Sequence, residues 1–151
     1  IFGRAFSGPY AQVIEYRSGV EVTSADSAQM LLSTNAGQVR GNVVNVIPPH
    51  HEGALVAASG LITGSNERFA PVDVLSYGSK AAPNVHVIGD SCATTQPKAG
   101  HVANQEAKVG AEALVRIFSG GQPDPSPVTN SACYSTISRT EATWILTPGN
   151  N

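Results

Sequence analysis

Charged residues are scarce in this sequence, and neither sign of charge dominates. They make up 13% of the 151 residues, and the formal net charge is −2. About a quarter of an average domain is charged. No basic stripe is present to hold a phosphate backbone, and no apolar run approaches the roughly 20 residues of a membrane-spanning helix. We therefore expect a globular chain that binds no nucleic acid and has no membrane span. Its low charge suggests a surface buried against another domain, a cofactor or a partner chain.

Cysteine is scarce as well, and the motifs of several common chemistries are missing. Cys92 and Cys133 lack the CxxC spacing and the neighbouring ligands of a zinc site, and His50-His51 has no carboxylate or cysteine at ligand spacing. We therefore expect no metal site. A disulfide between the two cysteines and a pair of free or buried thiols both remain open. No GxSxG elbow is present, and the glycines of residues 3–8 are not followed by the Lys-Ser/Thr of a P-loop.

The pyrophosphate-binding turn GxGxxG is also missing from the 151 residues. In dinucleotide-binding folds this turn joins a strand to a helix and brings its backbone against the pyrophosphate. If the chain handles a dinucleotide, we expect this half of the site to lie in a part of the same protein upstream of Ile1. The 151 residues alone are then expected to bind such a cofactor weakly or not at all, and to be inactive.

Apolar spacing in the first half of the sequence predicts both helices and strands. Tyr10, Val13 and Ile14 have helical spacing, so we expect a helix that begins near Pro9 and ends before Gly19. A small β meander is expected next, followed by a nearly continuous apolar strand of the buried parallel type, a short helix and a short strand. The expected ranges are 20–22, 29–34 and 38–40 for the meander, 42–47 for the buried strand, 53–59 for the helix and 72–75 for the last strand.

The clearest pattern lies in the second half. A strand over 85–88 is expected to end in Gly89-Asp90, and apolar and small residues at i, i+3 and i+4 spacing predict a long helix over 99–118. Small residues let such a helix approach a sheet or a cofactor closely. An extended, proline-rich linker over 122–131 and an apolar tail that needs a docking surface are expected to follow.

Gly89-Asp90 is the strongest candidate for chemistry. A glycine at a strand end lets the backbone contact a ligand closely, and the carboxyl ends of strands are where open α/β sheets bind ligands. A carboxylate there suits the hydroxyl groups of a sugar or ribityl chain, and the start of the next helix suits an electron-rich carbonyl or a developing anion. The alternative is that Asp90 only caps a turn.

Lys98 and His101 flank the start of the predicted helix. Lys98 adds positive charge beside the same crevice. His101 either touches a cofactor or substrate or is a solvated residue of the first turn. His86 alternates with two valines, so we expect it to face the other side of its strand.

Five blocks of sequence, in this order, resemble the flavoprotein subunit of flavocytochrome c sulfide dehydrogenase. That family is similar in turn to the sulfide:quinone reductases and the glutathione-reductase-like superfamily. The resemblance covers the chain from about Tyr10 to its end. The blocks are VVNVIPPH (43–50), APVD (70–73), NVHVIGDSCA (84–93), QPKAGHVANQEAKVGAEAL (96–114) and ACYS (132–135).

The resemblance implies an α/β fold that forms the C-terminal part of a flavoprotein with two dinucleotide-binding domains. Residues 1–70 look like the end of the NAD-like domain, residues 71–121 like the C-terminal part of the FAD-binding domain, and residues 122–151 like a C-terminal interface tail. The expected architecture is a small β meander, a strand–Gly-Asp–helix unit and an extended tail.

The resemblance also implies FAD as the cofactor of an oxidoreductase that passes electrons from a small donor to a cytochrome-like acceptor. It assigns no catalytic residue. It implies a periplasmic location and, as partners, a cytochrome c-type subunit or a second copy of the chain. Gly89 and Asp90 match residues that bind the ribityl and phosphate region of FAD, whereas the residues expected beside the isoalloxazine ring are Pro97, Lys98, Ala99 and His101.

One departure from the family pattern bears on catalysis. In the sulfide dehydrogenases the residues before Pro-Val-Asp typically end in Trp-Cys, and that cysteine is half of a redox disulfide beside the flavin. Here the matching residues are Phe69 and Ala70. Alanine has no thiol, so this position cannot take part in the usual disulfide relay, whereas the flavin-binding blocks are unaffected. A non-catalytic dimerisation or partner-docking module is therefore the second hypothesis.

Overall fold

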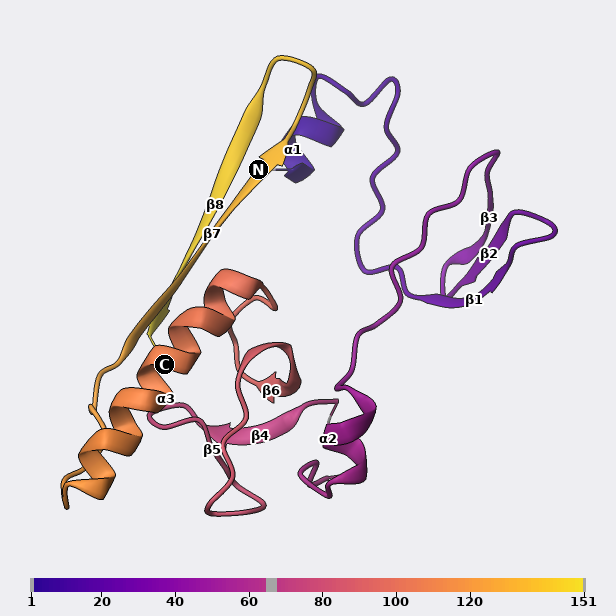
Figure 1. Ribbon diagram of the computed structural model, residues 1–151. Coiled ribbons are helices and arrows are strands. Elements are labelled where there is room, and N and C mark those ends of the chain that lie inside the picture. The colour runs from indigo at the N-terminus through magenta and orange to yellow at the C-terminus, as the bar shows by residue number, and fades with distance from the viewer. Residues whose placement is uncertain (1, 65–67, 151) are drawn as a thin grey trace. The chain divides into compact units, whose positions relative to one another are not determined.

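The computed structural model describes residues 2–64 and 68–150. The chain divides into two compact units, residues 1–49 and residues 50–151, and each contains both helical and sheet structure (Figure 1). The prediction of a mixed α/β class is confirmed at this level. No helix in the described ranges combines the length and apolar character needed to cross a bilayer.

The first unit contains helix α1 (Phe2–Ser7) and a three-stranded antiparallel meander. The meander consists of β1 (Val22–Asp26), β2 (Leu31–Thr34) and β3 (Gly37–Arg40). Gly37 has a φ of 116°, which lets the chain reverse tightly between β2 and β3. The meander predicted from sequence is therefore confirmed, with its first strand displaced toward the C-terminus.

Two predictions in the first unit are wrong. The N-terminal helix ends at Ser7, before Pro9, and residues 8–13 form turns. A β-carbon on Gly8 would lie 2.7 Å from the Arg4 carbonyl oxygen, so the chain turns closely against the helix end. Residues 42–47 form no strand, and Val43 and Ile47 are 86% and 77% exposed. Apolar composition alone does not make a strand when no neighbouring strand is hydrogen-bonded to it.

The second unit is built around a small sheet and one long helix, α3 (Gly100–Phe118). Strand β4 (Ala70–Asp73) is central, antiparallel to β5 (Gly78–Ser79) and parallel to β6 (Cys92–Ala93). Short helix α2 (Ala54–Ala58) precedes the sheet and ends next to Gly60, as predicted. The predictions of α2, β4 and α3 are confirmed to within two residues at most ends.

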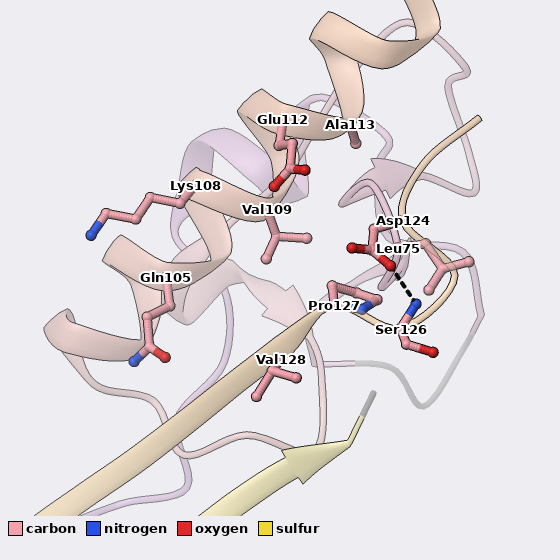
Figure 2. Close-up of a pocket in the computed structure, with 10 residues that line it drawn as sticks. All are labelled: Leu75, Gln105, Lys108, Val109, Glu112, Ala113, Asp124, Ser126, Pro127 and Val128. Atoms are coloured by element: carbon pink, nitrogen blue, oxygen red, sulfur yellow. Dashed lines mark hydrogen bonds between the residues drawn. The ribbon is translucent and has the colours of Figure 1, made fainter. Parts of the chain in front are cut away.

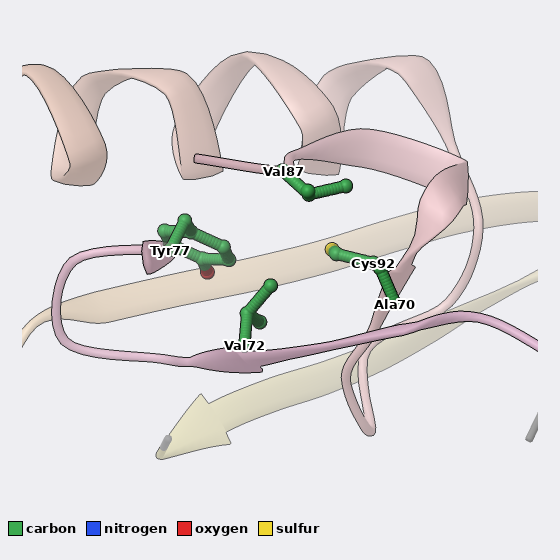
Figure 3. Close-up of a cluster of buried hydrophobic side chains, with 5 residues drawn as sticks. All are labelled: Ala70, Val72, Tyr77, Val87 and Cys92. Carbon is green, nitrogen blue, oxygen red and sulfur yellow. The ribbon is translucent and has the colours of Figure 1, made fainter. Parts of the chain in front are cut away.

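The buried apolar cluster of the second unit lies between α3 and β4 (Figure 3). A β-carbon on Gly110 would lie 3.4 Å from the Ser76 carbonyl oxygen, so the glycine allows α3 to approach the sheet connection closely. The prediction that small residues on this helix serve a close approach agrees with this contact. The cluster consists of Ala70, Val72, Tyr77, Val87 and Cys92.

The predicted strand over 85–88 is wrong. Only His86 forms a bridge, antiparallel to Gly78, and the Val87 N–H donates to the Tyr77 carbonyl at 2.9 Å. This segment therefore runs beside β5 without becoming a parallel strand, and the 3-10 turn η1 (Gly89–Ser91) follows it. The parallel partner of β4 is instead the two-residue β6.

The C-terminal part forms a long hairpin instead of an extended tail. Strands β7 (Val128–Thr136) and β8 (Ala142–Asn150) pair antiparallel along their whole length. The extended linker was predicted over 122–131, but β7 already begins at Val128. The hairpin was not predicted because Trp144, Ile145 and Leu146 are consecutive in β8 and lack the polar/apolar alternation that predicts a half-buried strand.

Candidate functional site

The Gly89-Asp90 turn lies against the N-terminal half of α3. Gly89 has a φ of 71°, and a β-carbon there would lie 3.3 Å from the Ala103 β-carbon. A larger residue would therefore be strained by its backbone and crowded by the helix. The Asp90 side chain lies in an exposed position. The structure thus brings the glycine-aspartate turn to the first turns of the predicted helix.

A buried carboxylate holds this turn in place. Glu106 on α3 is 1% exposed, and its Oε2 accepts a hydrogen bond from the Gly89 N–H at 2.5 Å. Its Oε1 accepts one from the Thr94 hydroxyl at 3.5 Å. No salt bridge to Glu106 occurs within the described residues. Hydrogen bonds to a backbone amide and to polar side chains therefore compensate for its removal from water.

Sequence analysis missed Glu106. It lies four residues after Val102 and four before Gly110, and all three are buried on the same face of α3. A charged residue inside an otherwise small and apolar helical stripe was the available signal. Its meaning depends on the Gly89 amide 17 residues earlier, which helical periodicity does not reveal.

Cys92 is a buried thiol next to the same carboxylate. Its Sγ lies 3.1 Å from the Gly89 carbonyl oxygen and 3.6 Å from Glu106 Oε2. Burial, reinforced by the negative charge of Glu106, raises the pKa of Cys92 to about 11. The thiol is therefore protonated at neutral pH, unlike a redox nucleophile. Cys92 and Cys133 are both free, which answers the question of a disulfide between them.

Ala70 occupies the position where the resembling family has a redox cysteine. It is fully buried, and its register partner on the parallel strand β6 is Cys92. The methyl group of Ala70 is therefore part of the apolar cluster of the second unit. A buried alanine beside a protonated thiol offers no disulfide chemistry at this point of the fold.

The segment before α3 carries Pro97, Lys98 and Ala99. Ala99 is the N-cap in extended conformation, and no side chain caps the helix there. Lys98 Nζ donates to the Cys92 carbonyl oxygen and lies 4.5 Å from the centroid of the Phe69 ring. The ammonium group of Lys98 is thus directed toward Phe69 and the β6 strand.

His101 contacts the hairpin. Its Nε2 lies 3.1 Å from the Ser131 hydroxyl oxygen and accepts a hydrogen bond from the Ala132 N–H at 3.4 Å. One turn later, Gln105 donates to the Asn130 carbonyl and accepts from its N–H, at 2.8 and 2.9 Å. His101 and Gln105 therefore join α3 to β7.

A separate pocket of about 360 Å³ lies between α3 and residues 124–128 (Figure 2). Its charged lining residues are Lys108, Glu112 and Asp124, and the Asp124 carboxylate accepts a hydrogen bond from the Ser126 N–H at 2.9 Å. None of the residues predicted to bind a cofactor lines it. Within the described ranges, no group of three or more His, Cys, Asp or Glu residues could hold a metal ion.

Comparison with known proteins gives a fold likeness. No family model matches the chain. A chain in the cryo-EM structure of the Tetrahymena thermophila mitochondrial ATP synthase, an F1Fo composite tetramer, matches with a TM-score of 0.69 and 14% sequence identity. The match covers 92% of this chain and 34% of that one, so this chain spans about a third of the matched chain's length. At this identity the likeness concerns the fold alone.

Proposed function

We propose that this chain is the C-terminal, FAD-binding portion of a flavin-dependent oxidoreductase resembling the sulfide dehydrogenase flavoprotein. The intact protein passes electrons from a small donor to a cytochrome-like acceptor, in the periplasm. In this proposal residues 1–70 end the NAD-like domain, residues 71–121 complete the FAD-binding domain, and residues 122–151 form an interface. The single observation that supports it best is the exposed Asp90 carboxylate on a turn that buried Glu106 fixes against α3.

The residues at this turn fit a ribityl chain. Asp90 accepts hydrogen bonds from hydroxyl groups, and Gly89 places the backbone next to the ligand without a side chain in the way. Pro97, Lys98 and Ala99 lead into α3, whose N-terminal end carries partial positive charge. The Lys98 ammonium adds to that potential. His101 binds β7 through its ring, so we assign it the role of holding the hairpin beside this helix end.

Gly89, Asp90, Pro97, Lys98 and Ala99 would hold FAD, which would supply the redox chemistry of the proposed reaction. The residues of this chain would bind and orient the cofactor, and Lys98 with the start of α3 would place positive charge beside it. Since Ala70 and Cys92 provide no disulfide, we expect the donor to act without a cysteine relay from this part of the protein.

Flavin retention tests the role of Asp90. We expect Asp90→Ala in the full-length protein to lower FAD affinity about 10- to 100-fold, because a hydrogen bond to a charged group contributes about 1.5–3 kcal/mol. Asp124→Ala removes a half-buried carboxylate elsewhere in the second unit and serves as the control. Equal FAD retention by the Asp90 variant and the control would overturn the assignment.

The hairpin supports a second function, partner docking. Tyr134 and Trp144 form a cross-strand pair with ring centroids 6.4 Å apart, and they are 79% and 55% exposed. On the opposite side of β7, Thr129 and Ser131 are 0% and 1% exposed. The hairpin thus turns aromatic groups outward and hydroxyl groups inward, as an interface strand does when a partner covers its apolar face.

Substitution of the aromatic pair tests this second function. We expect Tyr134→Ser with Trp144→Ser to reduce the mass of the assembly, or its binding to a c-type cytochrome, with the fold retained. Light scattering and titration with the cytochrome measure the two effects. Unchanged mass together with unchanged cytochrome binding would exclude the hairpin as the docking surface.

A further inference from the structure

A second pocket of the second unit has a positively charged lining. It has a volume of about 580 Å³, and three of its lining residues are cations: Arg68, Lys80 and Lys98. No described lining residue is acidic, although the whole chain has a net charge of −2. The remaining lining residues are Phe69, Val72, Val74, Ala93, Thr94 and Thr95.

Two of these cations make cation–π contacts with the Phe69 ring. Lys98 Nζ lies 4.5 Å and Arg68 Cζ 5.6 Å from the centroid of the same ring. Arg68 also donates to the His50 carbonyl oxygen at 3.0 Å, and Lys98 donates to the Cys92 carbonyl oxygen. The ring and two neutral carbonyl groups thus hold the cations, and these partners carry no negative charge to balance them.

The three cations of this pocket form no salt bridge with a described carboxylate. Glu106 lies behind Thr94 and is buried, outside the lining. Like charges gathered around one pocket repel each other, and a bound anion relieves that repulsion. The hydroxyl groups of Thr94 and Thr95 add neutral donors for its oxygens.

We propose that this pocket binds a small molecule through a phosphate or carboxylate group. Arg68 and Lys80 are its principal anion-binding residues, since both lie outside the set assigned to FAD. Lys98, in the segment before α3, also lines the pocket and adds a third positive charge. The inference does not depend on the proposed flavoprotein function, because it requires only the pocket and its charges.

Anion titration of the full-length protein tests the proposal. Inorganic phosphate and acetate are titrated separately by calorimetry at constant ionic strength, and saturable binding of either anion is expected. The double variant Arg68→Gln with Lys80→Gln should weaken binding about tenfold or more, because charged hydrogen bonds are lost. Lys108→Gln removes one positive charge at an exposed residue of α3 that lines the other pocket and should change affinity less than about twofold.

Three results would overturn the proposal. These are no saturable binding of either anion, equal weakening by the Lys108 variant, and loss of anion binding when the protein is loaded with FAD. The last result would assign the pocket to the cofactor. Failure of the flavoprotein proposal is recognised separately, as a full-length protein that contains no FAD, and the anion titration can still be read in that protein. Thermal melting of each variant establishes that the fold is retained.

Discussion

Helix α3 and the β7–β8 hairpin invert the usual distribution of side chains in opposite ways. The helix buries a carboxylate, Glu106, whereas the hairpin exposes an aromatic pair, Tyr134 and Trp144. The buried carboxylate has partners inside the chain, since it accepts hydrogen bonds from Gly89 and Thr94. The two exposed rings stack on each other. The helix therefore satisfies its buried carboxylate within the chain, whereas we propose that a partner covers the exposed rings of the hairpin.

The largest effect is expected from removing the buried carboxylate. Glu106→Ala leaves the Gly89 N–H without its acceptor and opens a cavity, so we expect a loss of about 2–4 kcal/mol of unfolding free energy. Glu106→Gln keeps an acceptor and should cost less. Urea denaturation measures both, with Glu112→Gln on the exposed side of α3 as control. A Glu106→Ala variant as stable as the control would show that the carboxylate does not hold the turn.

A smaller effect is expected at Gly89. Gly89→Ala places a β-carbon at positive φ and 3.3 Å from that of Ala103, so we expect a loss of about 1–3 kcal/mol. At Gly100 a β-carbon would meet nothing within 4 Å, and Gly100→Ala should be neutral or stabilising. Denaturation midpoints of the two variants test this contrast. If both glycines tolerate alanine equally, the close approach of the turn to α3 is not a constraint.

The smallest loss of unfolding free energy is expected from substitutions in the hairpin. Tyr134→Ser with Trp144→Ser removes one exposed cross-strand aromatic pair, so we expect a loss of no more than about 1 kcal/mol. The same change is expected to affect assembly or cytochrome binding. A loss of several kcal/mol would instead assign the rings a structural role within the chain. Thermal melting at one fixed protein concentration distinguishes the two outcomes.

Titration of the Cys92 thiol is expected to make the stability of the folded chain depend on pH. Its folded-state pKa of about 11 lies above the ordinary value of 9.0, so the folded protein holds the thiol proton more tightly than the unfolded chain does. The resulting stabilisation is complete below pH 9 and is lost as the pH rises toward 11. We expect Cys92→Ala to lack this decline and Cys133→Ala to retain it. Parallel stability curves for the wild type and the Cys92 variant between pH 7 and about 10.5 would contradict this assignment.

Sequence patterns predicted the elements whose stability is local. The meander, α2 and α3 have turn glycines, helix stops and periodic spacing within a few residues of each element. Residues 42–47 and 85–88 were predicted as strands from composition, but strand formation depends on partners distant in sequence. Hence the first segment is coil in which Val43 and Ile47 are exposed, and the second makes only the His86 bridge.

Individual residues of the candidate site could be predicted from sequence, but the hydrogen bonds that join distant residues could not. Gly89, Asp90 and the start of α3 were identified from sequence, and the structure places the glycine against Ala103. Glu106 was missed because its role depends on a backbone amide 17 residues away. The attachment of His101 to Ser131, 30 residues later, was missed for the same reason. Hydrogen bonds between residues this far apart in sequence depend on the folded chain, so local sequence patterns do not predict them.

Flavin content of the full-length protein tests the central claim most directly. The protein is purified, its absorbance between 300 and 550 nm is recorded, and the flavin is released by denaturation and quantified against protein. We expect a yellow protein with about one FAD per chain. A colourless full-length protein that releases no FAD would contradict it.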